Sequence, residues 1–502
     1  MKNAMCIMIQ GTMSGAGKSL LCGALCRIFR QDGYRVVPFK SQNMALNSYV
    51  TREGLEMGRA QVMQAEAAGV EPDVRMNPVL LKPSSDIGSQ VIVWGEVRGH
   101  MAASEYYEYK KQLIPDVLKA YNELAAENDI IVIEGAGSPA EINLRENDIV
   151  NMGLAQMVDA PVLLAGDIDR GGVFAQLYGT TELLEPSEKS RIEGMIINKF
   201  RGDEEILRPG LDIIEEKTGI PVVGVVPYVQ ADIDDEDSLA PRLSVTKAVK
   251  PVDIAVIRLP RISNFTDFAP LEAHPVLGVR YVSSAAELKQ PDLIVIPGTK
   301  STVDDLLWMR QNGLEAAVMK QAASETPVMG ICGGYQMLGE DLSDPGHIEG
   351  ETEHVRGMGL LPVHTTFTEK KTRTRVRAQV TAEAFEGAEL DGYEIHMGKT
   401  VIDGEAFCRL ENGSDDGCCS GSVFGTYLHG LFDTGQLTER LASYLCESKG
   451  IRYDSAEPVS HGAYVQRQYD ILADSVREAL DMDRIYEVMK TYAVKRSEKD
   501  GL

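Results

Sequence analysis

The first 230 residues alternate short apolar runs, rich in β-branched residues, with longer amphipathic stretches. The apolar runs include DIIVIEG, APVLLAGD and IPVVGVVPY, and the amphipathic stretches include GKSLLCGALCRIFRQDG and EYYEYKKQLIPDVLKAYNELAAEN. Such apolar runs predict strands buried on both faces, because helices cover each side of a parallel sheet. The alternation therefore predicts a doubly wound α/β domain over residues 1–230.

A second alternating series, VDIAVIRL, PDLIVIPG and TPVMGIC, begins after an acidic, proline-containing stretch. It predicts another doubly wound open-sheet domain over 251–445, with an antiparallel extension formed by later strand-like runs such as RTRVRAQVTAEAF. The stretch 231–250 has no sustained apolar period, so we expect a linker there. Residues 446–502 are expected to form a helical C-terminal extension, in which the tail from about residue 457 has helical spacing and is expected to pack on the second domain.

The 502-residue chain carries a formal net charge of −25. A field of that sign repels nucleic acid and anionic membranes, so we expect neither as a partner. No apolar run approaches the length of a membrane span, and the N-terminus lacks the basic head and cleavage site of a secretory signal. The eight cysteines form no CxxC pair, which favours free thiols in the cytoplasm. The sequence leaves the oligomeric state open.

A glycine-rich loop connects the first predicted strand to the first predicted helix in MCIMIQGTMSGAGKSLLCGAL. Gly11, Gly15 and Gly17 allow the backbone to wrap around phosphate oxygens. Lys18 supplies a cation for the β- and γ-phosphates, and the Ser19 hydroxyl can bind Mg²⁺. Five residues rather than the usual four separate Gly11 from Gly17, but Gly-Lys-Ser opening a helix favours a nucleotide site over an empty turn.

Polar residues follow three other predicted strands of the first domain. Glu134 ends the strand of IVIEGAGS, where a carboxylate suits Mg²⁺; a salt-bridged or helix-capping acid is the alternative. Asp167 and Asp169 end the next strand, before two glycines that open a helix, which makes a second candidate anion site. Asn198, in MIINKF, ends a third strand, where its amide could bind a purine edge.

The loop spacing, IEGAGS and IINKF resemble the dethiobiotin synthetase-like family of ATP-dependent ligases. FKSQNMALNSYV, EMGRAQVMQAEA, LLKP, ENDIVNMGLA and DIDRGGVFAQ resemble its corrinoid branch, in particular the cobyric acid synthase family. The resemblance implies that Lys18, Ser19 and Glu134 bind MgATP and that Asn198 binds adenine. It also implies a role for Asp148, in ENDIVNMG, in the step that activates a carboxylate; a helix N-cap is the alternative role.

The second domain contains a cysteine between glycines in VMGICGGYQML. The pattern Gly330-Ile-Cys332-Gly-Gly334 has the form of a nucleophile elbow, a sharp strand-to-helix turn that needs small neighbours. The backbone amide of Gly333, at the start of the helix, could stabilise a thiolate and a developing oxyanion. A buried structural cysteine in a helix-opening turn is the alternative.

A downstream histidine decides between these two interpretations. His429, in SVFGTYLHGLF, follows a strand that ends at a glycine break and is the candidate base for Cys332. His396, in YEIHMG, is the competing candidate, and we expect it to shape the pocket instead. The backbone amides of Gly298 and Thr299, in LIVIPGTKST, are expected to supply further oxyanion donors at the neighbouring strand end.

These three segments resemble the class I glutamine amidotransferase domain in the type found in cobyric acid synthases. The resemblance implies that Cys332 attacks the glutamine carboxamide, that His429 transfers protons, and that Gly298 and Gly333 hold the oxyanion. The usual amidotransferase follows its histidine with Pro-Glu, and the glutamate orients the imidazole. Here Gly430 follows His429, so the sequence does not identify the orienting group, which is worth several kcal/mol in related triads.

Together, the two resemblances imply an ATP- and glutamine-dependent amidation of carboxylates b, d, e and g of adenosylcobyrinic acid a,c-diamide. Such a substrate is a polyanion, and a basic strand could attract it, although a solvated strand face is the usual explanation of such a pattern. The basic residues of that strand are Lys370, Lys371, Arg373, Arg375 and Arg377, and Arg145 and Arg170 are alternative anchors.

Three other functions remain open from the sequence. Cobyrinic acid a,c-diamide synthase has the same domains but amidates other carboxylates, and it carries an Asp-containing segment in place of FKSQNMALN. A partitioning-type ATPase with an inert amidotransferase-like domain would act on membrane or DNA, and the acidic chain without a basic amphipathic tail disfavours it. A non-catalytic corrinoid carrier ranks last, because no cobalt-ligating histidine stands out in a glycine-rich loop.

Overall fold

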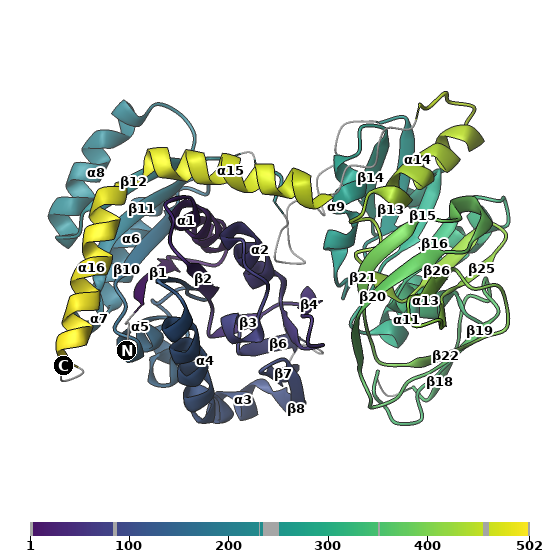
Figure 1. The fold of residues 1–502 in the computed structure, drawn as a ribbon, viewed down its shortest axis with the longest axis horizontal. Helices are drawn as coiled ribbons and strands as arrows, with labels where there is room; N and C mark the ends of the chain where they lie inside the picture. The colour runs from purple at the N-terminus through teal and green to yellow at the C-terminus, as the bar shows by residue number, and fades with distance from the viewer. Residues whose placement is uncertain are drawn as a thin grey trace. The chain divides into compact units, whose positions relative to one another are not determined.

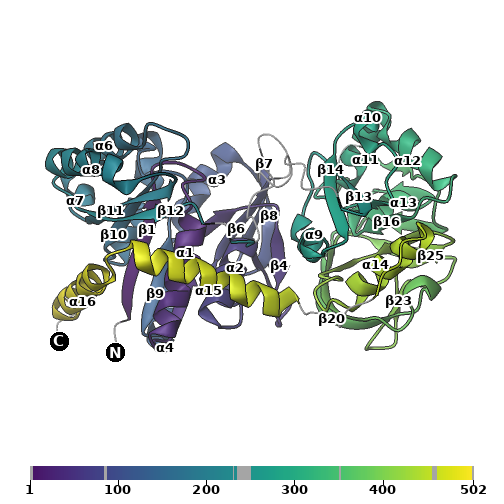
Figure 2. The same cartoon turned by 90° about the horizontal axis from the view of Figure 1, so that it is seen from above.

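The computed structural model describes residues 4–83, 88–229, 231–233, 250–349, 352–454 and 461–499. The chain divides into two compact units (Figures 1 and 2). Unit 1 comprises Met1–Met44, Met57–Ile233 and Val465–Leu502, and unit 2 comprises Ala45–Glu56 and Asp234–Tyr464. Each unit is built on a six-stranded, mainly parallel sheet, which confirms the predicted fold class. Of the expected linker, residues 234–249 lie outside the described part of the chain.

The sheet of unit 1 has the strand order β12-β11-β10-β1-β9-β2, and all its strands are parallel. The strands are β1 (Met5–Gly11), β2 (Val36–Phe39), β9 (Ile130–Glu134), β10 (Val162–Asp167), β11 (Ile192–Phe200) and β12 (Val222–Pro227). Parallel strands bring their carboxyl ends to one edge, and ligand-binding groups gather there. In register, Gly11 pairs with Ala165, and Asp167 pairs with Asn198.

Helices cover this sheet on both faces (Figure 1). The helices of unit 1 are α1 (Lys18–Gln31), α2 (Arg59–Ala68), α3 (Ala103–Tyr109), α4 (Ile114–Glu127), α5 (Met152–Met157), α6 (Val173–Leu183), α7 (Pro186–Lys189), α8 (Glu204–Thr218), α15 (His461–Ala479) and α16 (Met482–Lys499). The amphipathic stretch 105–128 does not form one continuous α-helix, because Pro115 lacks a backbone N–H and stands in the first turn of α4. A four-stranded sheet completes the unit, with β3 (Gln42–Met44), β6 (Val79–Pro83), β7 (Gly88–Val93) and β8 (Glu96–Ala102).

The C-terminal helices belong to unit 1, so the expectation that they pack on the second domain is wrong. Tyr469, Leu472 and Val476 of α15 are buried in the same core cluster as residues of β1 and α1. Arg27 on α1 donates to Asp470 at 2.8 Å. The helical spacing predicts that these residues share an apolar face, but it carries no information about which sheet that face covers.

The main sheet of unit 2 has the order β14-β13-β15-β16-β26-β25, parallel except for the edge strand β25. Its strands are β13 (Val252–Ile257), β14 (Leu277–Val282), β15 (Leu293–Ile296), β16 (Val328–Ile331), β25 (Cys418–Ser420) and β26 (Val423–Thr426). Its helices are α9 (Ala269–Ala273), α10 (Ala285–Leu288), α11 (Thr302–Gln311), α12 (Leu314–Ala322), α13 (Gly333–Leu338) and α14 (Gln436–Ser448). A short 3-10 helix, η5 (Phe265–Phe268), follows β13.

Smaller sheets extend unit 2 beyond the main sheet. A five-stranded antiparallel sheet contains β20 (Thr372–Val380), β21 (Glu389–His396), β23 (Cys408–Leu410), β24 (Asp415–Asp416) and β27 (Leu428–His429). A four-stranded sheet contains β17 (Asp341–Ser343), β18 (His354–Arg356), β19 (Val363–Thr366) and β22 (Lys399–Ile402). The segment Ala45–Glu56, with β4 (Ser48–Val50) and the first residue of β5 (Glu56–Gly58), also belongs to this unit. In the sequence it lies within the first 60 residues, inside the stretch predicted for the first domain.

Candidate active sites

The glycine-rich loop lies between β1 and α1, as the sequence predicts for a phosphate-binding loop. Gly15 and Gly17 have φ angles of 76° and 90°, a region that glycine enters without steric cost. A Cβ on Gly17 would lie 2.2 Å from the amide nitrogen of Asn198. Lys18 Nζ turns back over the loop and donates to the carbonyls of Met13 and Gly137, at 3.1 and 3.0 Å. These two contacts hold the ammonium group over the loop, and its interaction with a phosphate stays a prediction.

The structure brings the two predicted Mg²⁺ ligands together. Ser19 Oγ donates to Glu134 Oε1 at 2.8 Å, and the Glu134 side chain is 1% exposed. Lys40 Nζ also donates to Glu134 at 2.8 Å, and Gln64 Nε2 donates at 2.5 Å. A hydroxyl beside a carboxylate fits the oxygen-only preference of Mg²⁺, with phosphates and water completing the shell. Gln64 Oε1 is buried without a hydrogen-bond partner among the described residues, which leaves an acceptor for such a water.

Lys40 is a further residue at this site, and no motif of the sequence points to it. It follows β2 in the segment FKSQN, and its ammonium group forms a buried ion pair with Glu134. The salt-bridge alternative for Glu134 is thus present together with the hydroxyl contact from Ser19. The signal that could have found Lys40 is its position, because it follows a parallel strand at the same sheet edge as Glu134.

Asn198 and Asp148, predicted to bind adenine and to act in the activated-carboxylate step, both form hydrogen bonds with the backbone of unit 1. Asn198 Nδ2 donates to the carbonyl of Ala16 at 2.8 Å, so its amide contacts the phosphate loop. The Asp148 carboxylate accepts hydrogen bonds from the backbone amides of Val150, Asn151 and Gly153, at 2.8–2.9 Å. Asp148 therefore caps the start of α5, and its participation in the activated-carboxylate step stays a prediction.

The other candidate anion-binding groups of unit 1 are engaged in ion pairs. Asp167 is buried and pairs with Lys199 Nζ at 2.8 Å and with Arg170 at 3.9 Å. Asp169 pairs with Arg201 at 3.1 Å. Arg145 pairs with Glu185 at 2.8 Å and with the buried Glu188 at 3.5 Å, a structural function that the sequence pattern did not distinguish from substrate binding.

Cys332 lies at the turn between β16 and α13 in a conformation that is unusual for a residue with a side chain. Its φ and ψ are 52° and −109°. A Cβ on Gly330 would lie 2.7 Å from the carbonyl oxygen of Gly334, and a Cβ on Gly334 would lie 2.0 Å from that of Ile296. Only glycines permit this turn, and backbone strain of this kind is characteristic of active sites. The geometry supports the nucleophile elbow over a structural cysteine.

His429 is buried beside Cys332 and is oriented by a carboxylate to which no sequence motif points. His429 Nδ1 lies 2.6 Å from Asp267 Oδ2, and Asp267 Oδ1 accepts the backbone N–H of Gly430 at 2.9 Å. Burial by itself lowers the pKa of His429, but the negative charge of Asp267 and a hydrogen bond with Cys332 outweigh it and raise the pKa. Because Nδ1 faces Asp267, Nε2 is the nitrogen available to the thiol.

Asp267 lies on η5, in the loop that follows β13, 162 residues before the histidine that it orients. No Pro-Glu follows His429, and Asp267 supplies the missing carboxylate from another part of the fold. The sheet topology could have pointed to Asp267. The strands β13 and β16 are parallel strands of one sheet, so the loop that carries Asp267 and the turn that carries Cys332 lie at the same sheet edge.

The competing histidine and the expected oxyanion donors surround this pair. His396 stacks on Tyr427 with ring centroids 3.6 Å apart, and burial lowers the pKa of His396 to about 4. A Cβ on Gly298 would lie 3.0 Å from His429 Cε1, and a Cβ on Gly333 would lie 2.8 Å from Thr299 Cγ2. The loop after β15 and the start of α13 therefore meet next to the imidazole, as an oxyanion site between their backbone amides requires.

The basic strand β20 is bound within its own unit. Lys371 forms an ion pair with Glu56, which is fully buried, at 2.5 Å. Arg375 donates to the hydroxyl of Tyr49 at 2.5 Å and pairs with Asp391 at 3.0 Å. These contacts hold the segment Ala45–Glu56 on the strand, so Lys371 and Arg375 have a structural function. A role for this strand in attracting substrate stays a prediction.

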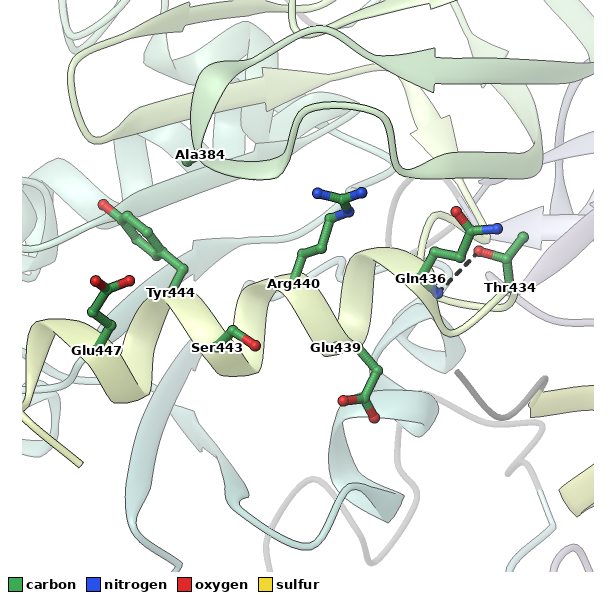
Figure 3. Close-up of a pocket in the computed structure, with 8 residues that line it drawn as sticks. All are labelled: Ala384, Thr434, Gln436, Glu439, Arg440, Ser443, Tyr444 and Glu447. Carbon is green, nitrogen blue, oxygen red and sulfur yellow. Dashed lines mark hydrogen bonds between the residues drawn. The ribbon is translucent and has the colours of Figure 1, made fainter. Parts of the chain in front are cut away.

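A surface hollow of about 860 Å³ lies along α14, outside both candidate sites (Figure 3). Its described lining residues include no residue predicted for either site. They are Ala384, Thr434, Gln436, Glu439, Arg440, Ser443, Tyr444 and Glu447. None of the helices in the described part of the chain is long and apolar enough to cross a membrane.

Residues 7–240 match the CobQ/CobB/MinD/ParA nucleotide binding domain, and residues 253–437 match the CobB/CobQ-like glutamine amidotransferase domain. Over 96% of its length the chain is similar to proteins named cobyric acid synthase. It is 56% identical to that of Ruminiclostridium cellulolyticum, over 96% of this chain and 97% of the other. The chain belongs to the cobyric acid synthase family.

A second member of the cobyric acid synthase family, from Lachnoclostridium phytofermentans, is 54% identical over 96% of this chain and 99% of its own. A third member, from Streptococcus sanguinis, is 52% identical over 96% of this chain and 98% of its own. The relatives therefore contain both units in one chain. The matched amidotransferase domain includes Asp267, Cys332 and His429, and the matched nucleotide-binding domain includes Lys18 and Glu134. Membership of the cobyric acid synthase family confirms the resemblance that both halves of the sequence carry.

Proposed function

We propose that this chain uses ATP and glutamine to amidate carboxylates b, d, e and g of adenosylcobyrinic acid a,c-diamide, giving adenosylcobyric acid. The observation that carries the proposal is the strained Cys332 elbow beside the His429–Asp267 pair, in the same chain as a phosphate-binding loop. One site is built to release ammonia and the other to bind nucleotide. A carboxamide is the product that needs both.

In the glutaminase half-reaction, the Cys332 thiolate attacks the carboxamide carbon of glutamine. The backbone amides of Gly298 and Gly333 stabilise the negative charge that develops on the carbonyl oxygen. His429 gives a proton to the leaving nitrogen, which departs as ammonia, and Cys332 is left as a thioester. His429 then accepts a proton from water, which hydrolyses the thioester to glutamate and frees the thiol, while Asp267 holds the imidazole in place.

In the synthetase half-reaction, the substrate carboxylate attacks the γ-phosphorus of ATP and gives an acyl phosphate and ADP. Lys18 offsets the charge of the β- and γ-phosphates, and Ser19 and Glu134 would hold Mg²⁺ beside them. Mg²⁺, when bound, supplies further charge stabilisation on the phosphate oxygens. Ammonia then attacks the acyl carbon, the C–O bond to phosphate breaks, and the products are a carboxamide and inorganic phosphate.

The test separates the two half-reactions with one variant in each unit. Cys332→Ala should abolish glutamine hydrolysis and glutamine-dependent amidation, yet retain amidation driven by ammonium chloride. Lys18→Ala should abolish amidation from either nitrogen source, because it acts on the acyl phosphate step. Glutamine-dependent corrinoid amidation that survives in either variant would refute the proposal.

Mass spectrometry of the product tests the choice of substrate. Each conversion of a carboxylate to a carboxamide changes the mass by a fixed amount, so the number of amides formed can be counted. With adenosylcobyrinic acid a,c-diamide as substrate, we expect four additions and four ATP consumed. Amidation of cobyrinic acid at positions a and c, without further additions, would identify the other corrinoid amidase instead.

A further inference from the structure

The segment Ala45–Glu56 links the nucleotide-site half of the sequence to the thiol site. The residues before it, through Met44, and after it, from Met57, belong to unit 1, whereas the segment itself belongs to unit 2. Five residues before it stands Lys40, which pairs with Glu134. Five and eight residues after it stand Gln61 and Gln64, which also donate to Glu134, at 3.3 and 2.5 Å.

The first part of this segment holds Asn264, the residue that starts η5. Asn264 N donates to Asn47 Oδ1 at 2.8 Å, and Asn264 Oδ1 accepts the backbone N–H of Ser48 at 3.2 Å. All three residues are at most 3% exposed. Asn264 has a φ of 52° and accepts the N–H of Asp267 at 3.1 Å through its own carbonyl. The reciprocal pair of hydrogen bonds therefore fixes the turn that presents Asp267 to His429.

The same segment also holds the residue that covers the imidazole. Tyr393 stacks on His429 with ring centroids 5.5 Å apart and an interplanar angle of 26°. Its hydroxyl donates to the carbonyl of Ser48 at 3.2 Å, and its ring meets that of Tyr49 edge-on at 5.6 Å. Val50 is buried in one cluster with Tyr393. Two independent sets of contacts thus end on the His429–Asp267 pair.

We propose that Asn47, Ser48 and Tyr49 are positioning residues for the glutaminase base, acting through Asn264 on Asp267 and through Tyr393 on His429. None of them touches the reacting atoms. Their effect is on the orientation of the imidazole, and small errors in the orientation of a catalytic group cost rate steeply. The glutaminase site of unit 2 is therefore completed by sequence that lies inside the nucleotide-binding half of the chain.

This position gives the segment a second effect, which rests on the proposed function. Its flanks carry Lys40, Gln61 and Gln64, whose hydrogen bonds all end on Glu134. When nucleotide and Mg²⁺ engage Glu134, these partners must share or release its oxygens, and the chain on both sides of the segment is affected. Glutamine turnover should therefore respond to nucleotide and corrinoid, and the response should depend on Asn47 and Tyr393.

The experiment measures glutaminase kinetics of the full-length chain with two substitutions that each remove one hydrogen bond. Asn47→Ala removes the acceptor for Asn264 N, and Tyr393→Phe removes the hydroxyl and keeps the stacked ring. We expect each to lower kcat for glutamine about tenfold, the equivalent of roughly one well-placed hydrogen bond, with KM changed less than twofold. Asn47→Asp keeps the acceptor oxygen and should recover most of the loss.

Tyr453→Phe is the matched control, because it removes another tyrosine hydroxyl of unit 2, bonded to Glu439 at 2.6 Å, away from the segment. It should leave kcat unchanged. A positioning role also requires that Asn47→Ala and Tyr393→Phe keep the wild-type melting temperature and the ammonia-dependent amidation rate. Wild-type kcat in both variants, or losses that only track a lowered melting temperature, would overturn the proposal.

The same assay, run with and without ATP and adenosylcobyrinic acid a,c-diamide, tests the response to the nucleotide site. The wild type should hydrolyse glutamine faster with both ligands present, and Asn47→Ala should lose most of that increase. An equal increase in the variant would overturn the link between the sites. If the wild type amidates no corrinoid with ammonia, the proposed function fails instead, and the ligand-free kcat values still decide the positioning role.

Discussion

Substitution of Asp267 by asparagine tests the assignment of the orienting carboxylate. Asparagine keeps the shape, and one oxygen can still accept the N–H of Gly430, but the negative charge 2.6 Å from His429 Nδ1 is lost. A buried, charge-assisted hydrogen bond contributes about 2–3 kcal/mol, which alone corresponds to roughly 30- to 150-fold in rate. An amide nitrogen facing Nδ1 would also favour the wrong tautomer, which costs up to about 10⁴-fold in serine protease triads.

We therefore expect Asp267→Asn to lower kcat of glutamine hydrolysis by roughly 10²- to 10⁴-fold with little change in KM. The assay is glutamate release under saturating glutamine, with ammonia-dependent corrinoid amidation as the internal control for a folded synthetase site. Asp344→Asn, a substitution of another buried aspartate of unit 2, which accepts the backbone amides of Ile348 and Glu349, is a control for the loss of a buried charge. A fall of less than threefold in Asp267→Asn would show that another group orients the imidazole.

The same variant predicts a change in the pH dependence of stability. Burial lowers the pKa of His429, but Asp267 and Cys332 raise it above the model-peptide value of 6.5, to about 10. A raised folded-state pKa stabilises the fold fully below about pH 6.5, and the contribution is lost as pH rises toward 10. The difference in unfolding free energy between wild type and Asp267→Asn should thus be largest near pH 6 and should shrink by pH 9.5. Urea titrations at both pH values measure this difference in unfolding free energy. A difference that does not change with pH would contradict a raised pKa of His429 in the folded state.

Three further substitutions test the structural claims. Gly17→Ala places a methyl group 2.2 Å from the Asn198 amide at a φ of 90°, so calorimetry should show ATP affinity reduced more than tenfold, with ligand-free glutaminase activity as the control. Gly334→Ala places a methyl group 2.0 Å from the carbonyl oxygen of Ile296, so the unfolding free energy of unit 2 should fall by roughly 2–4 kcal/mol. An unchanged melting temperature would contradict the elbow geometry. Arg27→Ala removes the ion pair to α15, which is partly exposed, and should cost about 1 kcal/mol and speed proteolysis of the C-terminal helices; cleavage at the wild-type rate would contradict their packing on unit 1.

Much of the fold was predictable because burial leaves a periodic signature. The runs DIIVIEG and APVLLAGD became β9 and β10, neighbours of β1 in a parallel sheet, and their carboxyl ends carry Glu134 and Asp167 as expected. The C-terminal helices were predicted as helices but assigned to the wrong unit. Their apolar spacing records that a face is buried, and the partner of that face is fixed by tertiary packing, which no local pattern encodes.

In the candidate sites, too, residues within a local sequence pattern were predictable, and residues that act across the fold were not. The sharp turn at Cys332 was predictable because such an elbow needs glycines at fixed offsets, and the loop before Lys18 was predictable because a phosphate loop has a fixed local form. Asp267 and Lys40 were missed because each acts across the fold, on a partner 162 or 94 residues away. The one feature that Asp267 and Lys40 share is that each follows a parallel strand. Many polar residues without a catalytic or binding role also follow parallel strands, so this position alone does not identify a site residue.

The origin of the orienting carboxylate changes how the thiol site can be controlled. In the usual amidotransferase the glutamate follows the histidine by two residues, so one short stretch of backbone fixes their geometry. Here Asp267 comes from the loop after β13, and its position depends on Asn264, which is held by Asn47 and Ser48. A base oriented through a separate loop can be turned on or off by whatever moves that loop, without disturbing the strand that carries His429. The missing Pro-Glu is therefore compatible with an active glutaminase, and it makes that activity dependent on residues supplied by the nucleotide-binding half of the sequence.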